Sequence, residues 1–539
     1  MNSNYYTPTF FRPIVALILL CLLSSLGAQD QPNILLIIAD DLGVDALNGY
    51  QESQLLPTTP HLDELRAQGI TFTNAWATPV CTPTRATTMS GKYGVKTGVL
   101  NVPGNLDLEH NSIFLELEEQ TNNAYADAVI GKWHISQPAD VDHPAQHSVD
   151  HYEGVMTGAV PDYYAWQKTV DGETALVKEY VTSHFTNSAI DWINNQTQPW
   201  FLWLAHVAPH TPFHIPPDSM YTIAQTNTEE QQFMAMIEAL DFSIGQLLAN
   251  IPETELENTL IIFMGDNGTA RQVIQNYPMA HNKGSVYQGG IHVPFIVAGA
   301  GVSRQGVEED ALVQVTDLYA TILDVVGAEL PGGIYNSKSF AHLLDGSEGT
   351  ERPYSYSETE SEDGPIFTIR NERWKLITFE DGTEEFYDLQ MDELELTDLI
   401  PGGLNNMQQA RREELRAEAQ DIRTGWSCQD LIQNGDEEDI DCGGSLCAPC
   451  VTSTDELSEH FKISVYPNPT TDQIIIDSPE EAITEMRLYN AIGQLVYERT
   501  GLQELRPSLS LQHYNSSIML VEIETASHRL VERIVLSSE

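Results

Sequence analysis

Two short polar segments of this chain carry oxygen ligands of the kind that a hard metal ion prefers. Asp40 and Asp41 directly follow the apolar run ILLIIA. Asp266 and Asn267 follow a second apolar run and have a glycine on each side, which allows a tight turn. Neighbouring carboxylates at the end of a buried strand repel one another unless a cation holds them, whereas a helix cap plus a turn residue comfortably explains only one aspartate. Such ligands suit Ca²⁺ better than zinc, with Mg²⁺ less favoured, so the sequence predicts a calcium site.

The N-terminus has the three-part pattern of a cleaved secretory signal. Arg12 precedes an apolar run from Pro13 to Leu26, and the small residues Gly27 and Ala28 follow it. The run is too short for a comfortable membrane span, and no later segment has the composition of one. We therefore expect cleavage near Ala28, export of the chain, and no membrane span in the mature protein.

The cysteines of the exported chain fall into two groups. Cys81 stands alone in the segment CTPTR, where it is either a buried, inert residue or one that is chemically modified. The others crowd together near the C-terminus, which predicts two disulfides, with a zinc site as the alternative. This second group comprises Cys428, Cys442, Cys447 and Cys450.

The charge balance excludes whole classes of partner. The 78 acidic and 26 basic residues give a formal net charge of -52, whereas binding to phosphate backbones or anionic membrane surfaces needs clustered lysine and arginine. We therefore expect neither nucleic acid nor a membrane surface as a partner. For an anionic substrate the same excess is a long-range repulsion, so any anion site must be a local pocket built from the few basic residues.

Four apolar runs must position the polar segments. ILLIIAD, AVIGKWH, WFLWLAH and LIIFMGDNG each have the composition of a strand buried on both faces, which is typical of a parallel sheet covered by helices. In open α/β sheets ligands bind beyond the carboxyl ends of the strands, where these polar residues lie. The pattern predicts an α/β fold with a large, mainly parallel sheet between helices.

The segment around Cys81 resembles a known signature. CTPTR, with Cys81, Pro83 and Arg85, is followed by SGKYG, and together they resemble the signature of the type I sulfatases in the alkaline-phosphatase-like superfamily. The resemblance covers about residues 31–400. It implies an alkaline-phosphatase-like fold and the oxidation of Cys81 by a maturase, before folding, to formylglycine (3-oxoalanine), whose hydrate is the nucleophile. This modification would account for the unpaired cysteine.

Three further motifs extend the resemblance and imply roles for basic residues. GKWH implies that Lys132 holds the anion and that His134 is an acid/base group. APHTP implies that His210 contacts the ester oxygen. NKGSVYQGG implies that Lys283 holds the sulfate, although Gln288 stands where the family usually has glutamate. The implied catalytic residues are Cys81, Arg85, Lys132, His134, His210 and Lys283, and the implied metal ligands are Asp40, Asp41, Asp266, Asn267 and Cys81 in its modified form.

The implied reaction is hydrolysis of a sulfate monoester. A cation together with lysine and arginine side chains neutralises the anionic oxygens, so that a hydroxyl of the hydrate can attack sulfur in line. Asp266 is a candidate base for this attack, and His210 or Lys283 protonates the departing alcohol. His134 then deprotonates the remaining hydroxyl, and the hydrate returns to the aldehyde and expels sulfate. A serine or cysteine nucleophile has no second hydroxyl through which to expel sulfate in this way.

Because we expect the protein to be exported, we predict that its substrate is a sulfated polysaccharide or its oligosaccharides. Tyr163, Tyr164, Trp166 and His214 are candidate sugar contacts, and a packing role explains each of them at least as well. The alternatives are a phosphate-ester or phosphonate hydrolase on the same scaffold, or a non-catalytic glycan-binding relative. Phosphatase relatives usually have serine or threonine in place of Cys81, and a degenerate binder should have lost a ligand, so the complete residue set favours the sulfatase.

The rest of the chain divides by composition. From Arg352 onward, alternation and turns predict a short antiparallel sheet, followed by a helix over MQQARREELRAEAQDIR. Near the C-terminus, FKISVYPNPTTDQIIID resembles the sorting domain of type IX secretion, a β-sandwich, which implies passage through the periplasm of a Gram-negative bacterium and release or attachment at the cell surface. The expected divisions are a signal peptide (1–28), a catalytic α/β domain (29–350), a small antiparallel α+β subdomain (351–425), an acidic Cys-rich linker (426–452) and the sorting β-sandwich (453–539).

Overall fold

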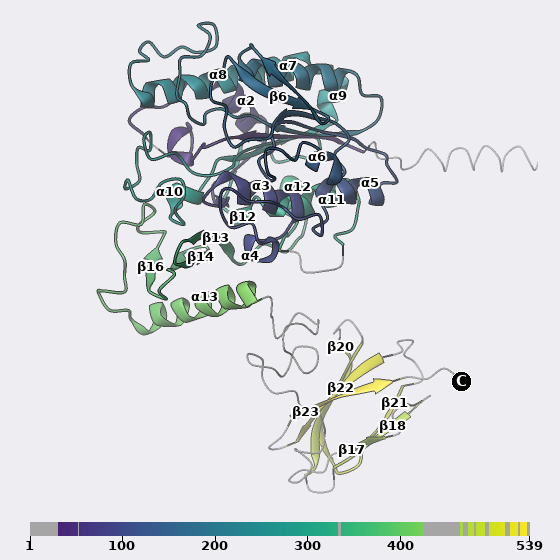
Figure 1. Ribbon diagram of the computed structural model, residues 1–539. Helices are drawn as coiled ribbons and strands as arrows, with labels where there is room; N and C mark the ends of the chain where they lie inside the picture. Colours follow the sequence, from purple (N-terminus) through teal and green to yellow (C-terminus); the bar gives the residue numbers. More distant parts are fainter. Residues whose placement is uncertain are drawn as a thin grey trace, which may run out of the picture. The chain divides into compact units, whose positions relative to one another are not determined.

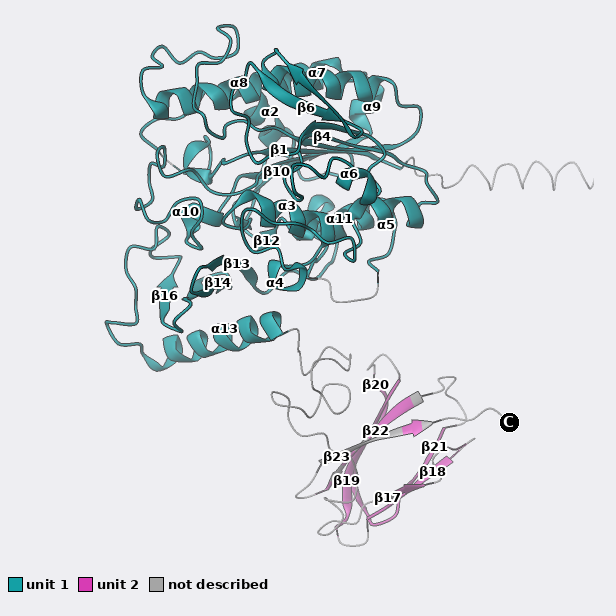
Figure 2. Ribbon diagram, viewed as in Figure 1, with its two compact units in different colours: residues 1–425 teal, residues 426–539 magenta. Residues whose placement is uncertain are grey.

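The computed structural model of the chain contains two compact units. It describes residues 31–51, 53–331 and 336–424 and, towards the C-terminus, residues 464–466, 470, 473–478, 481–490, 495–511, 518–525 and 529–535. Unit 1 is Met1–Gly425 and unit 2 is Trp426–Glu539 (Figure 2). The predicted signal peptide and the clustered cysteines near the C-terminus lie outside the described residues, so the disulfides stay a prediction.

A ten-stranded sheet forms the centre of unit 1. Its middle strands β9, β1, β8, β4 and β5 run parallel to one another, and antiparallel pairs are added towards both edges. This arrangement confirms the predicted α/β fold with a mainly parallel sheet. In spatial order the strands are β11 (Val307–Glu309), β2 (Ile70–Phe72), β10 (Phe295–Gly299), β9 (Thr259–Gly265), β1 (Asn33–Ala39), β8 (Trp200–Ala205), β4 (Ala126–Lys132), β5 (Tyr152–Val155), β6 (Trp166–Val170) and β7 (Glu173–Val177).

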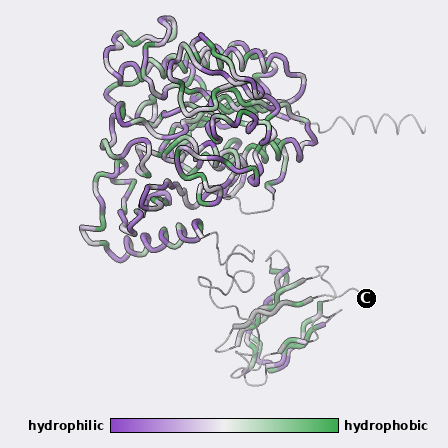
Figure 3. Tube along the Cα trace, viewed as in Figure 1, coloured by the Kyte–Doolittle hydropathy of each residue, from purple (hydrophilic) through white to green (hydrophobic). Residues whose placement is uncertain are grey.

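Helices cover both faces of this sheet (Figure 1). Successive side chains of a strand point to opposite faces, so β1 serves two cores: Ile34 and Leu36 belong to one, and Leu35 and Ile37 to the other. Figure 3 shows hydrophobic residues concentrated in the sheet at the centre of unit 1. The first core is closed by α3 (Cys81–Ser90), α5 (Ile113–Gln120), α11 (Asp317–Val325) and α12 (Ala341–Asp345), and the second by α2 (Pro60–Gln68), α7 (Val181–Asn194) and α8 (Glu229–Asn250). Among the described residues, no helix combines the length and apolar character needed to cross a bilayer.

Short elements complete the α/β part of unit 1. They lie in the connections between the longer strands and helices. They are η1 (Val44–Ala46), β3 (Ala75–Trp76), α4 (Gly94–Thr97), α6 (His143–Gln146), α9 (Glu253–Glu257), α10 (Gln288–Ile291) and β12 (Val313–Gln314), the last of which pairs with β3.

A four-stranded antiparallel sheet with one helix ends unit 1, as the alternation from Arg352 onward predicted. The strands β13 (Ser355–Ser361), β14 (Gly364–Arg370), β15 (Trp374–Thr378) and β16 (Glu384–Asp388) pair in sequence order. Helix α13 (Asn406–Thr424) contributes Leu415 and Ala419 to a core that includes Trp374, Leu376 and Phe386. We call this part, from β13 to α13, the C-terminal subdomain of unit 1.

Unit 2 is a small β-sandwich, in agreement with the expected sorting domain. Ile474 and Ile476 of one sheet share a core with Met486, Leu488 and Val521 of the other. One antiparallel sheet contains β17 (Ser464–Tyr466), β18 (Gln473–Asp477) and β21 (Ser508–Ser510), and the other contains β20 (Leu495–Glu504), β19 (Ile483–Asn490), β22 (Ile518–Thr525) and β23 (Arg529–Val535).

Candidate functional site

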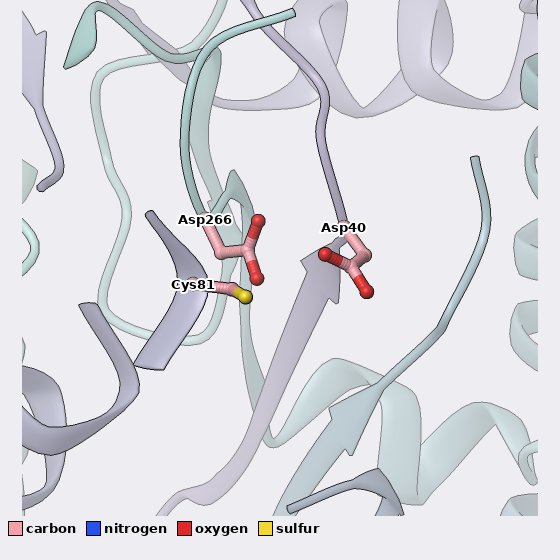
Figure 4. A group of neighbouring side chains, drawn as sticks. All are labelled: Asp40, Cys81 and Asp266. Carbon is pink, nitrogen blue, oxygen red and sulfur yellow. The ribbon is translucent and has the colours of Figure 1, made fainter. Parts of the chain in front are cut away.

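The parallel pairing of β1 and β9 brings the two oxygen-rich segments together. Ala39 pairs in register with Gly265, so Asp40 and Asp266 are the next residues of two neighbouring strands. Cys81 lies beside them: one ligand atom from each of Asp40, Cys81 and Asp266 falls within 4.8 Å of the others. Figure 4 shows the two carboxylates and the thiol around a common point at the end of β1.

Cys81 is the first residue of α3 and is only 3% exposed. Its Sγ lies 3.3 Å from Nδ1 of His134. Burial raises the pKa of the Cys81 thiol, and the carboxylates of Asp40 and Asp266 add to the rise, although Lys132 opposes it. The thiol therefore stays protonated, and a protonated thiol is a poor nucleophile.

The oxygen ligands leave positions open for a cation. Oδ1 of Asp40 and Oδ1 of Asn267 are buried and have no hydrogen-bond partner, which is costly unless a ligand satisfies them. The side-chain amide of Asn267 is held in place because its Nδ2 donates to Oδ1 of Asp41 at 2.9 Å. Asp40 and Asp41 also form a second group with His210 whose ligand atoms lie within 4.8 Å. The predicted ligands thus meet at one place and fit a hard divalent cation.

Each of the three carboxylates faces a basic side chain. Nζ of Lys132 lies 2.6 Å from Oδ2 of Asp40, and both side chains are fully buried. Nζ of Lys283 lies 2.5 Å from Oδ1 of Asp41. The guanidinium of Arg85 occupies the corresponding place beside Asp266. The site is therefore dense in both signs of charge, and every implied sulfate-holding cation lies within it.

These charges and their burial set the pKa values at the site. Burial would raise the pKa of Asp41, but Lys283, His210 and Lys132 together hold it well below its usual range. Burial would lower the pKa of Lys132, but Asp40 raises it. The pKa of Asp266 is raised by burial and by the neighbouring Asp40. The raised pKa values of Lys132 and Lys283 keep both lysines charged, and Asp266 accepts a proton more readily than Asp41.

The two predicted histidines contact different residues of the site. His134 follows β4 in a left-handed backbone conformation, with φ 57°, and burial together with Lys132 and Arg85 lowers its pKa to about 2. Its imidazole is therefore neutral. His210 follows β8, and its Nε2 lies 3.7 Å from Oδ2 of Asp41. A third histidine, His206, is completely buried and packs near Phe185.

Four residues that the sequence analysis assigned no such role support this site. Thr84 donates from Oγ1 to the carbonyl of Asp266 at 2.6 Å, and Oγ1 of Thr82 lies 3.3 Å from Nδ1 of His134. Gly158 packs so tightly on His134 that an added Cβ would lie 2.4 Å from the imidazole. The hydroxyl of Tyr163 donates to the carbonyl of His210 at 2.6 Å. The two threonines lie inside CTPTR, whereas Gly158 and Tyr163 carry no pattern that reveals a supporting role.

Burial separates the candidate sugar contacts. Tyr163 and Trp166 are 2% and 1% exposed, so both pack in the core and neither can contact a sugar. Tyr164 is 42% exposed, and its ring lies 5.1 Å from that of Tyr180. His214 is held by Pro212 through Nδ1 and by Tyr180 through Nε2. Only Tyr164 among the four presents a large aromatic surface to solvent.

Family models match three parts of the chain. The model described as "Sulfatase" matches residues 32–328, and the model described as "N-sulphoglucosamine sulphohydrolase, C-terminal" matches residues 279–423. The model described as "Secretion system C-terminal sorting domain" matches residues 464–537. The first range contains every residue that the sequence analysis placed at the site.

Individual proteins are similar to unit 1 at low sequence identity. N-acetylgalactosamine-6-sulfatase from Canis lupus familiaris is 26% identical over 381 residues, which are 62% of this chain and 70% of that one. The crystal structure of Ps i-CgsB in complex with k-i-k-neocarrahexaose is 24% identical, with a TM-score of 0.61 over 73% of this chain and 93% of that one. The PsFucS1 sulfatase from Pseudoalteromonas sp. is 22% identical, with a TM-score of 0.60 over 76% of this chain and 95% of that one. The two structures share the fold of unit 1.

Proposed function

We propose that this chain, which belongs to the sulfatase family and is a sulfuric ester hydrolase, removes sulfate from sulfated polysaccharides or from their oligosaccharides. Its sorting domain indicates secretion by the type IX system, and the route we propose runs through the periplasm of a Gram-negative bacterium to the medium or the cell surface. A glycan substrate is supported by the relatives: one is named for N-acetylgalactosamine, and another was solved with k-i-k-neocarrahexaose.

The nucleophile in this proposal derives from Cys81. A maturase would oxidise the cysteine to formylglycine, and the hydrated aldehyde would supply both the attacking hydroxyl and a second hydroxyl through which sulfate is expelled. The raised pKa of the buried thiol supports this modification, because an unmodified Cys81 would be a weak nucleophile.

A divalent cation completes the proposed site. Asp40, Asp41, Asp266, Asn267 and the modified residue 81 would hold it, and the unpartnered oxygens of Asp40 and Asn267 support this assignment. When bound, the cation would neutralise sulfate charge and lower the pKa of a bound hydroxyl. We propose Ca²⁺, with Mg²⁺ as the less favoured ion, because all the ligands are hard oxygens.

Basic side chains of the protein hold the sulfate group in this proposal. Lys132 pairs with Asp40 and Lys283 with Asp41, and Arg85 lies one turn after Cys81 in α3. Their positive charges would offset the anionic oxygens that otherwise repel a nucleophile. Since the chain as a whole is strongly acidic, this local concentration of positive charge is what would draw in a sulfate ester.

Two histidines would move the protons. The neutral His134, with Nδ1 3.3 Å from Sγ of Cys81, is placed to take a proton from a hydroxyl at position 81. Asp266, with its raised pKa, is a second candidate base. His210, whose Nε2 lies 3.7 Å from Oδ2 of Asp41, would donate a proton to the leaving alcohol oxygen, with Lys283 as the alternative donor. The net reaction consumes one water and releases sulfate and an alcohol.

The observation that carries the proposal is the meeting of Cys81, Asp40, Asp266 and His134 at one sheet edge. Peptide mass analysis of the purified, active protein tests it. We expect residue 81 to have lost sulfur and two hydrogens and to have gained one oxygen. A fully active preparation in which residue 81 is unmodified cysteine would overturn the proposed nucleophile.

Substrate identity needs a separate experiment. Release of inorganic sulfate should be measured by ion chromatography across a panel of defined sulfated oligosaccharides. Release of phosphate from the matching phosphate esters should be measured in parallel, to test the phosphatase alternative. We expect sulfate release from at least one sulfated oligosaccharide and no comparable phosphate release. Preferential hydrolysis of the phosphate esters would favour the phosphatase alternative instead.

A further inference from the structure

A buried ion pair lies in the C-terminal subdomain of unit 1, outside the site described above. Nζ of Lys375, on β15, lies 2.5 Å from Oε1 of Glu395, in the connection between β16 and α13, and both side chains are fully buried. A buried ion pair contributes little net stability, because desolvating two charges offsets most of their attraction. The other contacts of the two side chains are therefore the better guide to what the pair does.

Both members of this pair also bind the backbone that follows Lys283. Nζ of Lys375 donates to the carbonyl of Val286 at 2.9 Å. The amide of Gln288 donates to Oε2 of Glu395 at 2.5 Å. The segment 286–288 is thus held at two points, by a lysine that binds a carbonyl and a carboxylate that binds an amide.

The same segment is tied to the strand that leads to Cys81. Nε1 of Trp76, in β3, donates to Oε1 of Gln288 at 2.8 Å. Nζ of Lys375 lies 5.0 Å from the centroid of the same indole ring, within the range of a cation–π contact. The amide of Gly284 donates to the carbonyl of Pro79 at 2.8 Å. These contacts link the turn after Lys283 to the residues just before Cys81.

Regular secondary structure does not position Lys283. Residues 266–287, all of which the structure describes, connect β9 to α10 without a helix or a strand. A side chain on such a connection is placed only as well as its tertiary contacts hold the backbone. Glu395 has a left-handed backbone, with φ 57°, an unfavourable conformation for a residue other than glycine that its surroundings must maintain.

We propose that Lys375 and Glu395 are positioning residues, which hold segment 286–288 so that Lys283 reaches Asp41 at the catalytic centre. The proposal rests on the sulfate-holding role of Lys283 given above. Neither Lys375 nor Glu395 is among the groups around Cys81. The C-terminal subdomain would therefore act on the site through segment 286–288.

Substitutions in the full-length protein test this proposal. Lys375→Met keeps most of the buried stem and removes the charge and the donor. Glu395→Gln keeps an acceptor for the amide of Gln288, whereas Glu395→Ala removes it. The matched control is Arg373→Met, because Arg373 lies two residues from Lys375 and pairs with Asp388 instead.

Two readouts decide the outcome. Amide hydrogen exchange in peptides covering 284–290 should rise about tenfold in Lys375→Met and Glu395→Ala, and kcat/KM for sulfate release should fall about tenfold or more. Glu395→Gln should lie between Glu395→Ala and the unsubstituted protein in both readouts, and Arg373→Met should stay within about twofold of it. A purely structural role would instead raise exchange across the subdomain and would not rank the two Glu395 variants in this order.

Three results would overturn the proposal. They are unchanged exchange in 284–290, unchanged kcat/KM in folded Lys375→Met, or equal effects of Glu395→Gln and Glu395→Ala. If Lys375→Met does not fold, the two Glu395 variants decide alone. Exchange is measured without substrate, so it tests the positioning even if the protein releases no sulfate, a failure that would count against the proposed function instead.

Discussion

Arg85 and Asp266 form a buried ion pair in which Nη2 of Arg85 donates to Oδ2 of Asp266 at 2.7 Å. Nη1 of the same guanidinium donates to the carbonyl of Lys132 at 2.7 Å. One side chain from the first turns of α3 therefore joins the ends of β9 and β4 next to Cys81. A fork of this shape is specific to arginine, because an ammonium group cannot reproduce two diverging, planar N–H directions.

Arg85→Lys should therefore lower kcat/KM even though it keeps the charge. We expect a loss of about tenfold or more, equivalent to about 1.4 kcal/mol of transition-state stabilisation, together with a lower melting temperature. Steady-state kinetics with an aryl sulfate and thermal unfolding would measure both. Arg416→Lys, at a half-exposed pair with Glu384, is the control and should leave kcat/KM unchanged; unimpaired turnover by Arg85→Lys would show that the fork is dispensable.

Removal of the divalent cation should abolish sulfate release. The predicted ligands leave buried oxygens of Asp40 and Asn267 unpartnered, so a chelator should lower both activity and thermal stability, and Ca²⁺ should restore them more fully than Mg²⁺. Elemental analysis before and after chelation would give the bound metal. Asn267→Ala should lose the metal and Asn195→Ala, in an exposed turn, should keep it. Full activity in a metal-free preparation would contradict the site.

Gly158→Ala should impair turnover through His134. The new Cβ would lie 2.4 Å from the imidazole of His134, so the ring must leave its position 3.3 Å from Sγ of Cys81. We expect kcat/KM to fall about tenfold while the melting temperature changes by less than about 3 °C. The matched control is Gly402→Ala, whose added Cβ would be 3.6 Å from its nearest neighbour. Equal activity of the two variants would mean that the ring position is not critical.

Asp127→Asn should stabilise unit 1 in a pH-dependent way. Asp127 accepts a hydrogen bond from the amide of Asp150 at 2.9 Å, and burial raises its pKa to about 8. The folded protein therefore keeps a proton on Asp127 that the unfolded chain has lost above its ordinary pKa, so stability falls as pH rises from about 4 to about 8. Asparagine keeps the acceptor and removes the titration.

Thermal unfolding at two pH values checks this prediction. The quantity compared is the melting temperature of Asp127→Asn minus that of the unsubstituted protein. This difference should be about 2 to 5 °C larger at pH 8.5 than at pH 5.5. Asp191→Asn, which changes an exposed carboxyl group that binds no buried amide, serves as the control. A difference that is the same at both pH values would show that Asp127 is already ionised in the folded protein.

Four central strands and the C-terminal antiparallel sheet of unit 1 could be predicted from the sequence, because burial leaves a repeated pattern. The apolar runs before Asp40, Lys132, His206 and Asp266 correspond to β1, β4, β8 and β9, and the alternating residues after Arg352 form the antiparallel sheet of the C-terminal subdomain. Such periods arise from the geometry of the strand itself, so they are visible before any tertiary contact is known.

Burial of individual side chains was decided only by the tertiary structure. Tyr163 and Trp166 were equally good candidates for sugar contact and for packing, and their exposures of 2% and 1% assign them to the core. Tyr164, the next residue after Tyr163, is 42% exposed. Tyr163 and Tyr164 lie in a turn before β6, where no strand or helix period exists, so the sequence does not show which of the two side chains is exposed to solvent.

By itself the sequence determined the fold class, the family resemblance and the residues expected at the catalytic centre, because those depend on apolar periodicity and on short contiguous motifs. Only the tertiary structure decided how distant segments support that centre: Gly158 on His134, Tyr163 on His210, and the pair Lys375–Glu395 on the turn after Lys283. These supports join residues far apart in the chain through single side-chain contacts. A single contact leaves no repeat and no motif in either partner, so it exists only when the folded backbone brings the two together.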